Sequence, residues 1–264
     1  MPPRYLASDL DGTLIPPVLH ADRRRDIDEF TRRTEAGGLD LTYVTGRHLP
    51  LAMGGIGAAG LPWPARIFCD VGTSLHVRAG DGYVRDEAFR HTMAAALGET
   101  SMAGVRRLLD DVEGLVLQEP SKQTEFKLSY YVRGPAREAA AREVRRRLAP
   151  VRHRIEIISS EDPASGDGLL DLLPEAAGKR HALDWLCRTS GLAREDVLFA
   201  GDSGNDRDAL LSGHPAVLVG NAPDSLRTDL ARVAGHAGLG DRLYVARAPF
   251  AAGVVEGAEH FGFL

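Results

Sequence analysis

Short segments rich in apolar residues alternate with amphipathic stretches in the first and last thirds of the chain. The apolar segments are typical of buried parallel strands and lie at residues 5–7, 39–45, 66–69, 197–200 and 216–219. Ile27, Phe30 and Thr34 recur at helical spacing up to Gly37, and further helices are predicted over residues 179–190 and 206–211. This alternation predicts an α/β fold with a parallel sheet that is covered by helices on both faces.

The middle of the chain follows a different pattern. Leu128, Tyr130 and Val132 alternate with polar neighbours, as in a half-exposed antiparallel strand. The predicted elements are, in order, a helix at 102–112, strands at 115–117 and 128–132, a helix at 136–148, and strands at 155–158 and 169–173. This order predicts a smaller α+β module inserted into the α/β domain. We expect a core of residues 1–80 and 175–264 and an insert of residues 81–174.

Composition narrows the class of protein. A chain of 264 residues with 44% hydrophobic and 26% charged residues is ordinary for a soluble globular protein. The net charge of −5 gives no reason to expect nucleic acid as a partner. Cys69 and Cys187 match no metal or redox spacing, and this favours buried thiols in a reducing compartment. We expect no membrane span and no secretory leader, and therefore a cytoplasmic protein.

Two carboxylates stand two residues apart where the first strand ends. Asp9 and Asp11 follow the apolar run of residues 5–7, and Gly12 follows them directly. Side chains at positions i and i+2 of a strand share one face, and a turn at the strand end can direct both at one point. Two carboxylates that close repel each other unless a cation or a proton lies between them. The pair therefore predicts a metal site with a nucleophile beside an acid/base group.

Three other segments place polar groups at strand ends or helix starts. They are Thr45-Gly46-Arg47 after the second strand, Lys179 at the start of a helix, and Gly201–Asp206 after the strand at 197–200. Open α/β sheets bind their ligands at the carboxyl ends of the strands. A hydroxyl, a guanidinium, and an ammonium at a helix N-terminus all favour a phosphate group there. Asp202 and Asp206 add two more carboxylates, and oxygen ligands are what Mg²⁺ prefers.

Each motif alone has another interpretation. Asp9-x-Asp11-Gly12 could begin a calcium loop, but the twelfth position from Asp9 is His20 rather than the required Glu. The same motif matches the Asp-x-Asp pair of a metal-dependent glycosyltransferase, which is the main alternative from another reaction class. Asp202 and Asp206 could also be an Asx turn and a helix cap. The order acid pair, hydroxyl, lysine, acid pair favours one shared site.

A glycine-rich segment matches a dinucleotide-binding fingerprint literally. Gly55–Gly60 has the spacing G-x-G-x-x-G, but no predicted strand precedes it. Leu61-Pro-Trp-Pro64 follows where that fingerprint requires a helix. We therefore predict a loop at this position and no nucleotide site.

The ordered set of motifs resembles the haloacid dehalogenase (HAD) superfamily of phosphohydrolases. The resemblance rests on Ser8–Leu14, Val44–Arg47, Lys179 and Gly201–Asp206, and the αββαββ insert resembles a type IIB cap. It implies a Rossmann-like core with a parallel sheet. A closer resemblance is to sucrose-phosphate phosphatases and mannosylfructose-phosphate phosphatases, and it rests on residues 70–73, 127–132, 170–174, 177–179 and 251–261. Residues 161–168 depart from that pattern as an insertion.

The resemblance implies a role for each motif residue. Asp9 would attack phosphorus and become an aspartyl-phosphate, and Asp11 would protonate the leaving oxygen and later deprotonate the hydrolytic water. The cofactor would be Mg²⁺, held by Asp9, the backbone carbonyl of Asp11, Asp202 and Asp206. The transferring phosphoryl group and the rest of the substrate would contact Thr45, Gly46, Arg47, Lys179 and Asn205.

The insert would have to supply groups that bind the sugar. Lys127, placed on the polar face of its strand, and Asp171, the lone charge in residues 169–173, are the candidates, with an exposed structural role as the alternative for each. The implied substrate is a sugar phosphate, specifically a disaccharide or glycoside phosphate similar to sucrose 6-phosphate. Such an activity is compatible with a functional pairing with a glycosyltransferase. Within the superfamily, a phosphomutase and a monosaccharide-phosphate phosphatase are the alternatives.

Overall fold

The computed structural model describes residues 4–133, 137–161 and 166–264 and divides into two compact units. Unit 1 comprises Met1–Arg85 and Lys179–Leu264, and unit 2 comprises Asp86–Gly178. Residues 81–85, which the sequence analysis assigned to the insert, contribute strand β5 (Gly82–Arg85) to the sheet of unit 1.

Within the described residues, unit 1 is built on an eight-stranded sheet in the order β12-β11-β10-β1-β2-β3-β4-β5. The strands from β12 to β3 are parallel, and β4 and β5 are antiparallel additions at one edge. The bounds are β1 (Tyr5–Ser8), β2 (Asp40–Val44), β3 (Arg66–Cys69), β4 (Ser74–Ala79), β10 (Val197–Gly201), β11 (Ala216–Leu218) and β12 (Leu243–Val245). The predicted parallel sheet is confirmed, and the antiparallel edge was not foreseen.

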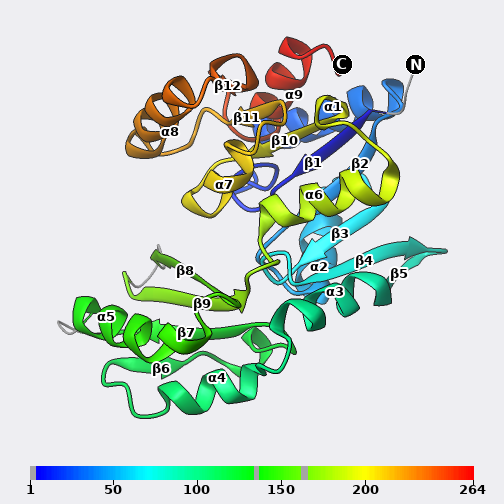
Figure 1. Ribbon diagram of the computed structural model, residues 1–264. Helices are drawn as coiled ribbons and strands as arrows, with labels where there is room; N and C mark the ends of the chain where they lie inside the picture. Colours follow the sequence, from blue (N-terminus) through cyan, green and yellow to red (C-terminus); the bar gives the residue numbers. More distant parts are fainter. Residues whose placement is uncertain (1–3, 134–136, 162–165) are drawn as a thin grey trace. The chain divides into compact units, whose positions relative to one another are not determined.

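Helices cover both faces of this sheet (Figure 1). One contacting pair is α1 with α9, and a second is α6 with α7. The bounds are α1 (Ala21–Ala36), α2 (Leu49–Ala59), α6 (Lys179–Ser190), α7 (Arg207–Leu210), α8 (Asp224–His236) and α9 (Phe250–His260), with short 3-10 turns η3 (Arg194–Asp196), η4 (Gly204–Asp206) and η5 (Gly240–Arg242). The buried face of α1 consists of Ile27, Phe30 and Thr34, as predicted from their spacing.

The loop predicted for residues 55–60 is wrong, because α2 extends to Ala59. Pro50 lies in its first turn, and Gly60 ends it in the left-handed conformation with a φ of 75°. Ala52, Ile56 and Ala59 bury one side of this helix in the core of unit 1. This tertiary burial outweighs the low helix propensity of the glycines.

Unit 2 carries a four-stranded antiparallel sheet in the order β6-β7-β9-β8 within the described residues. Its elements are α3 (Glu87–Leu97), α4 (Met102–Leu109), β6 (Leu115–Leu117), η1 (Pro120–Lys122), β7 (Leu128–Val132), α5 (Arg137–Leu148), η2 (Ala149–Val151), β8 (Ile155–Glu161) and β9 (Gly168–Pro174). From α4 onward the order is the predicted αββαββ. The insertion predicted at residues 161–168 lies partly outside the described residues, and its end residues Glu161 and Gly168 pair with each other.

Helix α3 was not predicted. Phe89, Met93 and Leu97 are buried at helical spacing, and the side chain of Asp86 caps the helix by accepting from the N–H of Phe89 at 2.8 Å. The sequence analysis began the insert at residue 81, whereas the division between the units falls at Asp86, the residue that caps this helix.

Two predictions from composition can be compared with the fold. Among the described residues, none of the helices combines the length and the apolar character needed to cross a membrane. Neither Cys69 nor Cys187 forms a disulfide; Cys69 is buried and Cys187 is only half-buried.

Candidate active site

The carboxyl ends of three adjacent strands bring polar residues together at one edge of the sheet of unit 1. Strand β1 lies between β10 and β2, and Ser8 at its end pairs with Ala200 and Tyr43. Asp9, Thr45 and Asp202 therefore follow neighbouring strands, and the N–H of Asp9 donates to the carbonyl of Ala200 at 3.0 Å. This is the edge at which open α/β sheets bind ligands.

A buried lysine joins two of the carboxylates at this edge. The ammonium of Lys179 lies 2.8 Å from Oδ1 of Asp9 and 2.6 Å from Oδ1 of Asp206. The Lys179 side chain is 1% exposed, and those of Asp9 and Asp206 are 5% and 0% exposed. Lys179 is the first residue of α6, so the start of this helix places its ammonium directly beside the nucleophile candidate.

The second oxygen of Asp206 organises its own loop. It accepts from the N–H groups of Asp202 at 3.1 Å and Ser203 at 3.0 Å, and from the Ser203 hydroxyl at 3.1 Å. A Cβ at Gly201 would lie 2.5 Å from Cγ of Asp206, so only glycine fits there. Asp206 thus fixes the loop that carries Asp202 while its first oxygen binds Lys179.

The cluster holds more negative than positive charge. Asp9, Asp202 and Asp206 each offer an oxygen within 4.8 Å of the others. Burial raises the pKa of Asp9 to about 8, against the opposing effect of Lys179, and the charge of Asp206 raises it further. Burial and the charge of Asp206 also raise the pKa of Asp202 to about 6. Although burial disfavours the ammonium, the two carboxylates raise the pKa of Lys179. An oxygen-only donor set with excess negative charge suits a hard divalent cation such as Mg²⁺.

The turn between Asp9 and Leu14 contacts Asp202 directly. Gly12 adopts a φ of +79°, and a Cβ there would overlap the Asp202 carboxylate. The hydroxyl of Thr13 donates to Oδ1 of Asp202 at 2.8 Å. The sequence analysis did not single out Thr13, although its position after a strand end would have been sufficient reason.

Asp11 lies apart from the buried cluster. Its side chain is 53% exposed and forms a bidentate ion pair with Arg47, in which Nε donates to Oδ2 at 2.7 Å and Nη2 contacts Oδ1. Nη1 of Arg47 also donates to the carbonyl of Leu51 at 3.2 Å. A Cβ at Gly55 would overlap this guanidinium. Gly55, one of the glycines that match the dinucleotide-binding fingerprint, therefore makes room for the side chain of Arg47.

The remaining predicted residues of unit 1 surround these two groups. Thr45 is fully buried, and its hydroxyl oxygen accepts from the N–H of Arg47 at 3.2 Å. Gly46 is exposed at the tip of the same turn. Asn205 is exposed, and its Oδ1 accepts from the hydroxyl of Ser203 at 3.0 Å.

The two predicted sugar-binding residues belong to unit 2. Lys127 was expected on the polar face of a strand, but it directly precedes β7 and is only 3% exposed, so that expectation is wrong. Alternation of polar and apolar residues begins only at Leu128, inside the strand. Asp171 is half-buried on β9, pairs in register with Ser129, and accepts from its hydroxyl at 2.5 Å.

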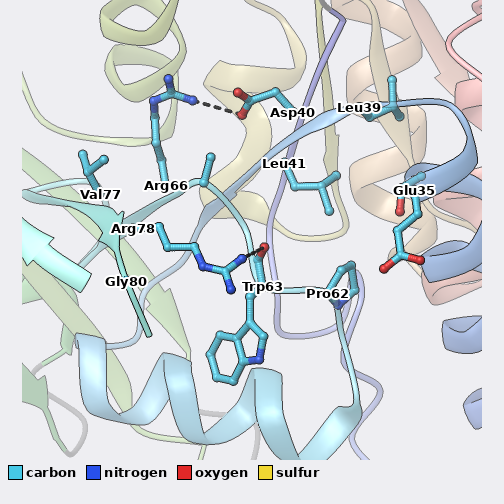
Figure 2. A pocket seen from close by; sticks show the side chains of 12 residues that line it. Glu35, Leu39, Asp40, Leu41, Pro62, Trp63, Arg66, Val77, Arg78 and Gly80 are labelled. Carbon is cyan, nitrogen blue, oxygen red and sulfur yellow. Dashed lines mark hydrogen bonds and ion pairs between the residues drawn. The ribbon is translucent and has the colours of Figure 1, made fainter. Parts of the chain in front are cut away.

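A cavity of about 830 Å³ lies elsewhere in unit 1 (Figure 2). Asp40 and Arg66, which pair at 3.0 Å, are the first residues of β2 and β3 and line it. Arg78 lines another side and donates to the carbonyl of Trp63 at 3.4 Å. Because Thr45 follows the opposite end of β2, this cavity opens at the far edge of the sheet, and no predicted site residue lines it.

Comparisons with known proteins agree with this geometry. The family model of sucrose-6F-phosphate phosphohydrolase matches residues 2–262. The chain is 34% identical to a HAD-like hydrolase from Nitrosococcus oceani over 97% of this chain and 71% of that protein. It is 29% identical to mannosylfructose-phosphate phosphatase from Agrobacterium fabrum over 99% of this chain and 98% of that protein.

Solved structures share the fold. The sucrose-phosphatase from Synechocystis, solved in complex with sucrose and phosphate, has a TM-score of 0.80 and 24% identity over 100% of both chains. A HAD subclass IIB sugar phosphatase has a TM-score of 0.64 and 18% identity over 99% of this chain and 100% of that chain. These likenesses confirm the predicted HAD architecture, with an α/β core and a type IIB α+β insert.

Proposed function

Because the chain belongs to the sucrose-6F-phosphate phosphohydrolase family, and is thus a phosphoric monoester hydrolase, we propose that it hydrolyses a disaccharide or glycoside phosphate through an aspartyl-phosphate. The observation that carries the mechanism is the buried contact of Lys179 with Asp9 and Asp206. It leaves one oxygen of a desolvated carboxylate beside a fixed positive charge, where a phosphoryl group would be both attacked and neutralised.

The covalent step uses Asp9 and Asp11. A carboxylate oxygen of Asp9 bonds to phosphorus while the bond from phosphorus to the sugar oxygen breaks, and Asp11 gives its proton to that oxygen. Water then attacks phosphorus, Asp11 takes back a proton, and Asp9 leaves as a free carboxylate with release of inorganic phosphate. The half-exposed position of Asp11 supports this role, because both the leaving sugar and the incoming water must reach it.

Charge on the transferring group is balanced by neighbouring donors. Lys179 supplies an ammonium, and the turn of Thr45, Gly46 and Arg47 supplies a hydroxyl, the N–H of Gly46 and a guanidinium. The exposed side chain of Asn205 would add an amide donor to this group of residues. Arg47 holds Asp11 in the ion pair described above, so its contact with substrate requires that this pair opens.

The donor set fits Mg²⁺, with Asp9, Asp202 and the backbone carbonyl of Asp11 as the residues that would hold it. Asp206 contributes charge, although both of its oxygens already accept hydrogen bonds. Bound there, Mg²⁺ would neutralise charge on the phosphoryl oxygens and on Asp9. The raised pKa values of Asp9 and Asp202 support this fit, because burial and the charge of Asp206 disfavour their ionised forms and a bound cation would offset both effects.

The test of this function is phosphate release with Mg²⁺ across a panel of mono- and disaccharide phosphates, with Asp9→Asn protein as the blank. We expect one disaccharide or glycoside phosphate to be preferred by at least about tenfold in kcat/KM, because only a full substrate provides the contacts that are realised in the transition state. Weak hydrolysis of every substrate would retain the phosphatase and reject the substrate class. Interconversion of sugar phosphates without phosphate release would identify a phosphomutase instead.

For the sugar, we propose contacts with Lys127 and Asp171. Lys127→Met and Asp171→Asn should lower kcat/KM for the preferred sugar phosphate by about tenfold and leave p-nitrophenyl phosphate hydrolysis within about twofold. Lys122→Met is the matched control, because Lys122 is an exposed lysine five positions away on the same segment. Equal losses on both substrates would assign Lys127 and Asp171 to the stability of unit 2.

The glycosyltransferase alternative is less supported. An Asp-x-Asp metal pair requires both carboxylates to face one ion, whereas here Asp9 contacts Lys179 and Asp11 contacts Arg47. The family match over residues 2–262 also favours hydrolysis.

A further inference from the structure

Asn221 links the loop of the nucleophile to the C-terminal segment of unit 1. Its Nδ2 donates to the carbonyl of Gly12 at 2.8 Å, and its Oδ1 accepts from the N–H of Phe250 at 2.9 Å. Gly12 and Phe250 lie far apart in the sequence, and one side-chain amide spans both backbones. Asn221 is exposed, so this bridge contributes to local geometry rather than to the core.

The peptide between Gly12 and Thr13 is held by hydrogen bonds on both sides. Its carbonyl is held by Asn221, and the N–H of the next residue, Thr13, donates to the carbonyl of Leu10 at 3.3 Å. The peptide plane is thereby fixed on both sides. Its orientation sets the position of the Thr13 hydroxyl, which donates to Asp202, and of the Asp11 backbone immediately before it.

The C-terminal partner of the bridge is itself held in place. Phe250 has a φ of 54°, which is an outlier for an aromatic residue and persists only where surrounding contacts impose it. The N–H of Gly220, next to Asn221, donates to the carbonyl of Ala248 at 2.8 Å. A Cβ at Gly220 would overlap the carbonyl of Arg247, so the two segments approach as closely as glycine allows.

Glu256 on α9 anchors the same segment from the other side. Its carboxylate accepts from the N–H groups of Ala248 at 2.8 Å and Arg247 at 3.1 Å, and from the hydroxyl of Tyr244 at 2.8 Å. The path from Glu256 to Gly12 thus runs through hydrogen bonds to residues 247–248, along the backbone to Phe250, and through the two hydrogen bonds of Asn221. It ends at the loop that carries both candidate catalytic carboxylates.

From this geometry we propose that Asn221 is a positioning residue that fixes the Gly12–Thr13 peptide for catalysis, with residues 247–250 as its support. The proposal rests on the proposed phosphatase function for its kinetic consequence. Its structural consequence, the ordering of residues 9–15, is independent of that function.

The experiment compares Asn221→Ala with wild type by amide hydrogen exchange and by kinetics on the full chain. Thr228→Ala is the control, because it removes an exposed side-chain hydrogen bond to the carbonyl of Asp224 on the neighbouring helix α8. We expect the amides of Gly12, Leu14 and Ile15 to exchange about tenfold faster in Asn221→Ala and unchanged in Thr228→Ala, because a net hydrogen bond is worth about one factor of ten.

In the same variant, kcat for p-nitrophenyl phosphate should fall about tenfold with KM within about twofold, and Mg²⁺ binding by calorimetry should weaken. Glu256→Gln should give a smaller effect in the same direction, and Asn221→Ala with Glu256→Gln should be no worse than Asn221→Ala alone. Faster exchange with unchanged kcat would overturn the positioning role, and unchanged exchange would overturn the bridge itself. If wild type releases no phosphate, the proposed function has failed, and exchange and Mg²⁺ binding still decide the role of Asn221.

Discussion

Asp9 and Asp11 are two residues apart and occupy opposite electrostatic environments. The side chain of Asp9 is 5% exposed and shares the buried ammonium of Lys179 with Asp206. The side chain of Asp11 is 53% exposed and forms an ion pair with Arg47, whose side chain is 20% exposed. In the buried cluster one ammonium faces two carboxylates, whereas Asp11 and Arg47 carry one charge of each sign.

Because Asp9 and Asp11 differ in burial and in their ion partners, one loop can carry two carboxylates with different tasks. In the buried cluster, charge decides the energetics, because desolvation magnifies every unbalanced carboxylate. At the exposed pair, water screens the charges and geometry is the main contribution, through the two parallel contacts of a guanidinium with a carboxylate. Changes in the buried cluster should therefore affect both stability and turnover, and changes at the exposed pair should affect turnover alone.

Lys179→Met removes the only ammonium that contacts both Asp9 and Asp206 among the described residues, and we expect it to cause the largest losses. It leaves Asp9 and Asp206 without their shared cation, so unfolding free energy without metal should fall by about 3–5 kcal/mol and phosphate release should fall by ~10³-fold. Chemical denaturation and phosphate release measure the two losses. Lys122→Met, which removes an exposed lysine, controls for the loss of one positive charge. Activity within tenfold of wild type would contradict the assignment of Lys179.

Removal of metal tests whether the buried cluster lacks positive charge. The folded-state pKa values of Asp9 and Asp202 are about 8 and about 6, above the reference of 3.8, so the folded protein keeps protons that the unfolded chain has released. Its stability without metal should therefore fall as pH rises from about 4 to about 8. We expect a decrease of several degrees in Tm between pH 5.5 and 8 in EDTA, and a much smaller decrease in saturating Mg²⁺. Equal slopes with and without Mg²⁺ would argue against a metal at this cluster.

Arg47→Lys changes the ion pair of Arg47 with Asp11, and we expect it to cause smaller losses than the changes above. Lysine keeps the charge but loses the bidentate contact with Asp11, so kcat/KM should fall about tenfold while unfolding free energy changes by less than ~1 kcal/mol. Arg32→Lys is the matched control, because Arg32 makes a two-pronged surface contact with Glu29 on α1. A large loss of stability in Arg47→Lys alone would show that the exposed pair supports the fold.

The sequence was sufficient wherever a local pattern carried the information. The apolar segments at residues 5–7, 39–45 and 197–200 locate the strands that end at residues 8, 44 and 201 to within one residue, and adjacency of parallel strands then places Asp9 and Asp202 near each other. The helix starting at Lys179 was predicted with its observed bounds because its apolar spacing and Gly191 define it. The chemical roles of these residues stay predictions that the variants above address.

Other features depend on contacts that no local pattern reveals. Helix α2 forms although it contains several glycines, because Ile56 is buried in the core. Gly55 leaves room for the guanidinium of Arg47. The bridge made by Asn221 requires that residues 12 and 250 meet in space. The burial of Lys127 was missed because a lysine beside an alternating strand is ordinarily exposed.

The pairing of β1 with β10 has a consequence for synthesis on the ribosome. Tyr5 pairs with Val197, so all of unit 2 and helix α6 are synthesised after β1 and before β10, the second neighbour of β1. At about 5–20 residues per second this interval is roughly 10–40 s. During that time the nascent chain presents the edge of β1, with the apolar Leu6 and Ala7, to other chains and to chaperones. Slower translation of the insert lengthens this exposure, so the yield of folded protein should depend on codon choice between residues 86 and 178.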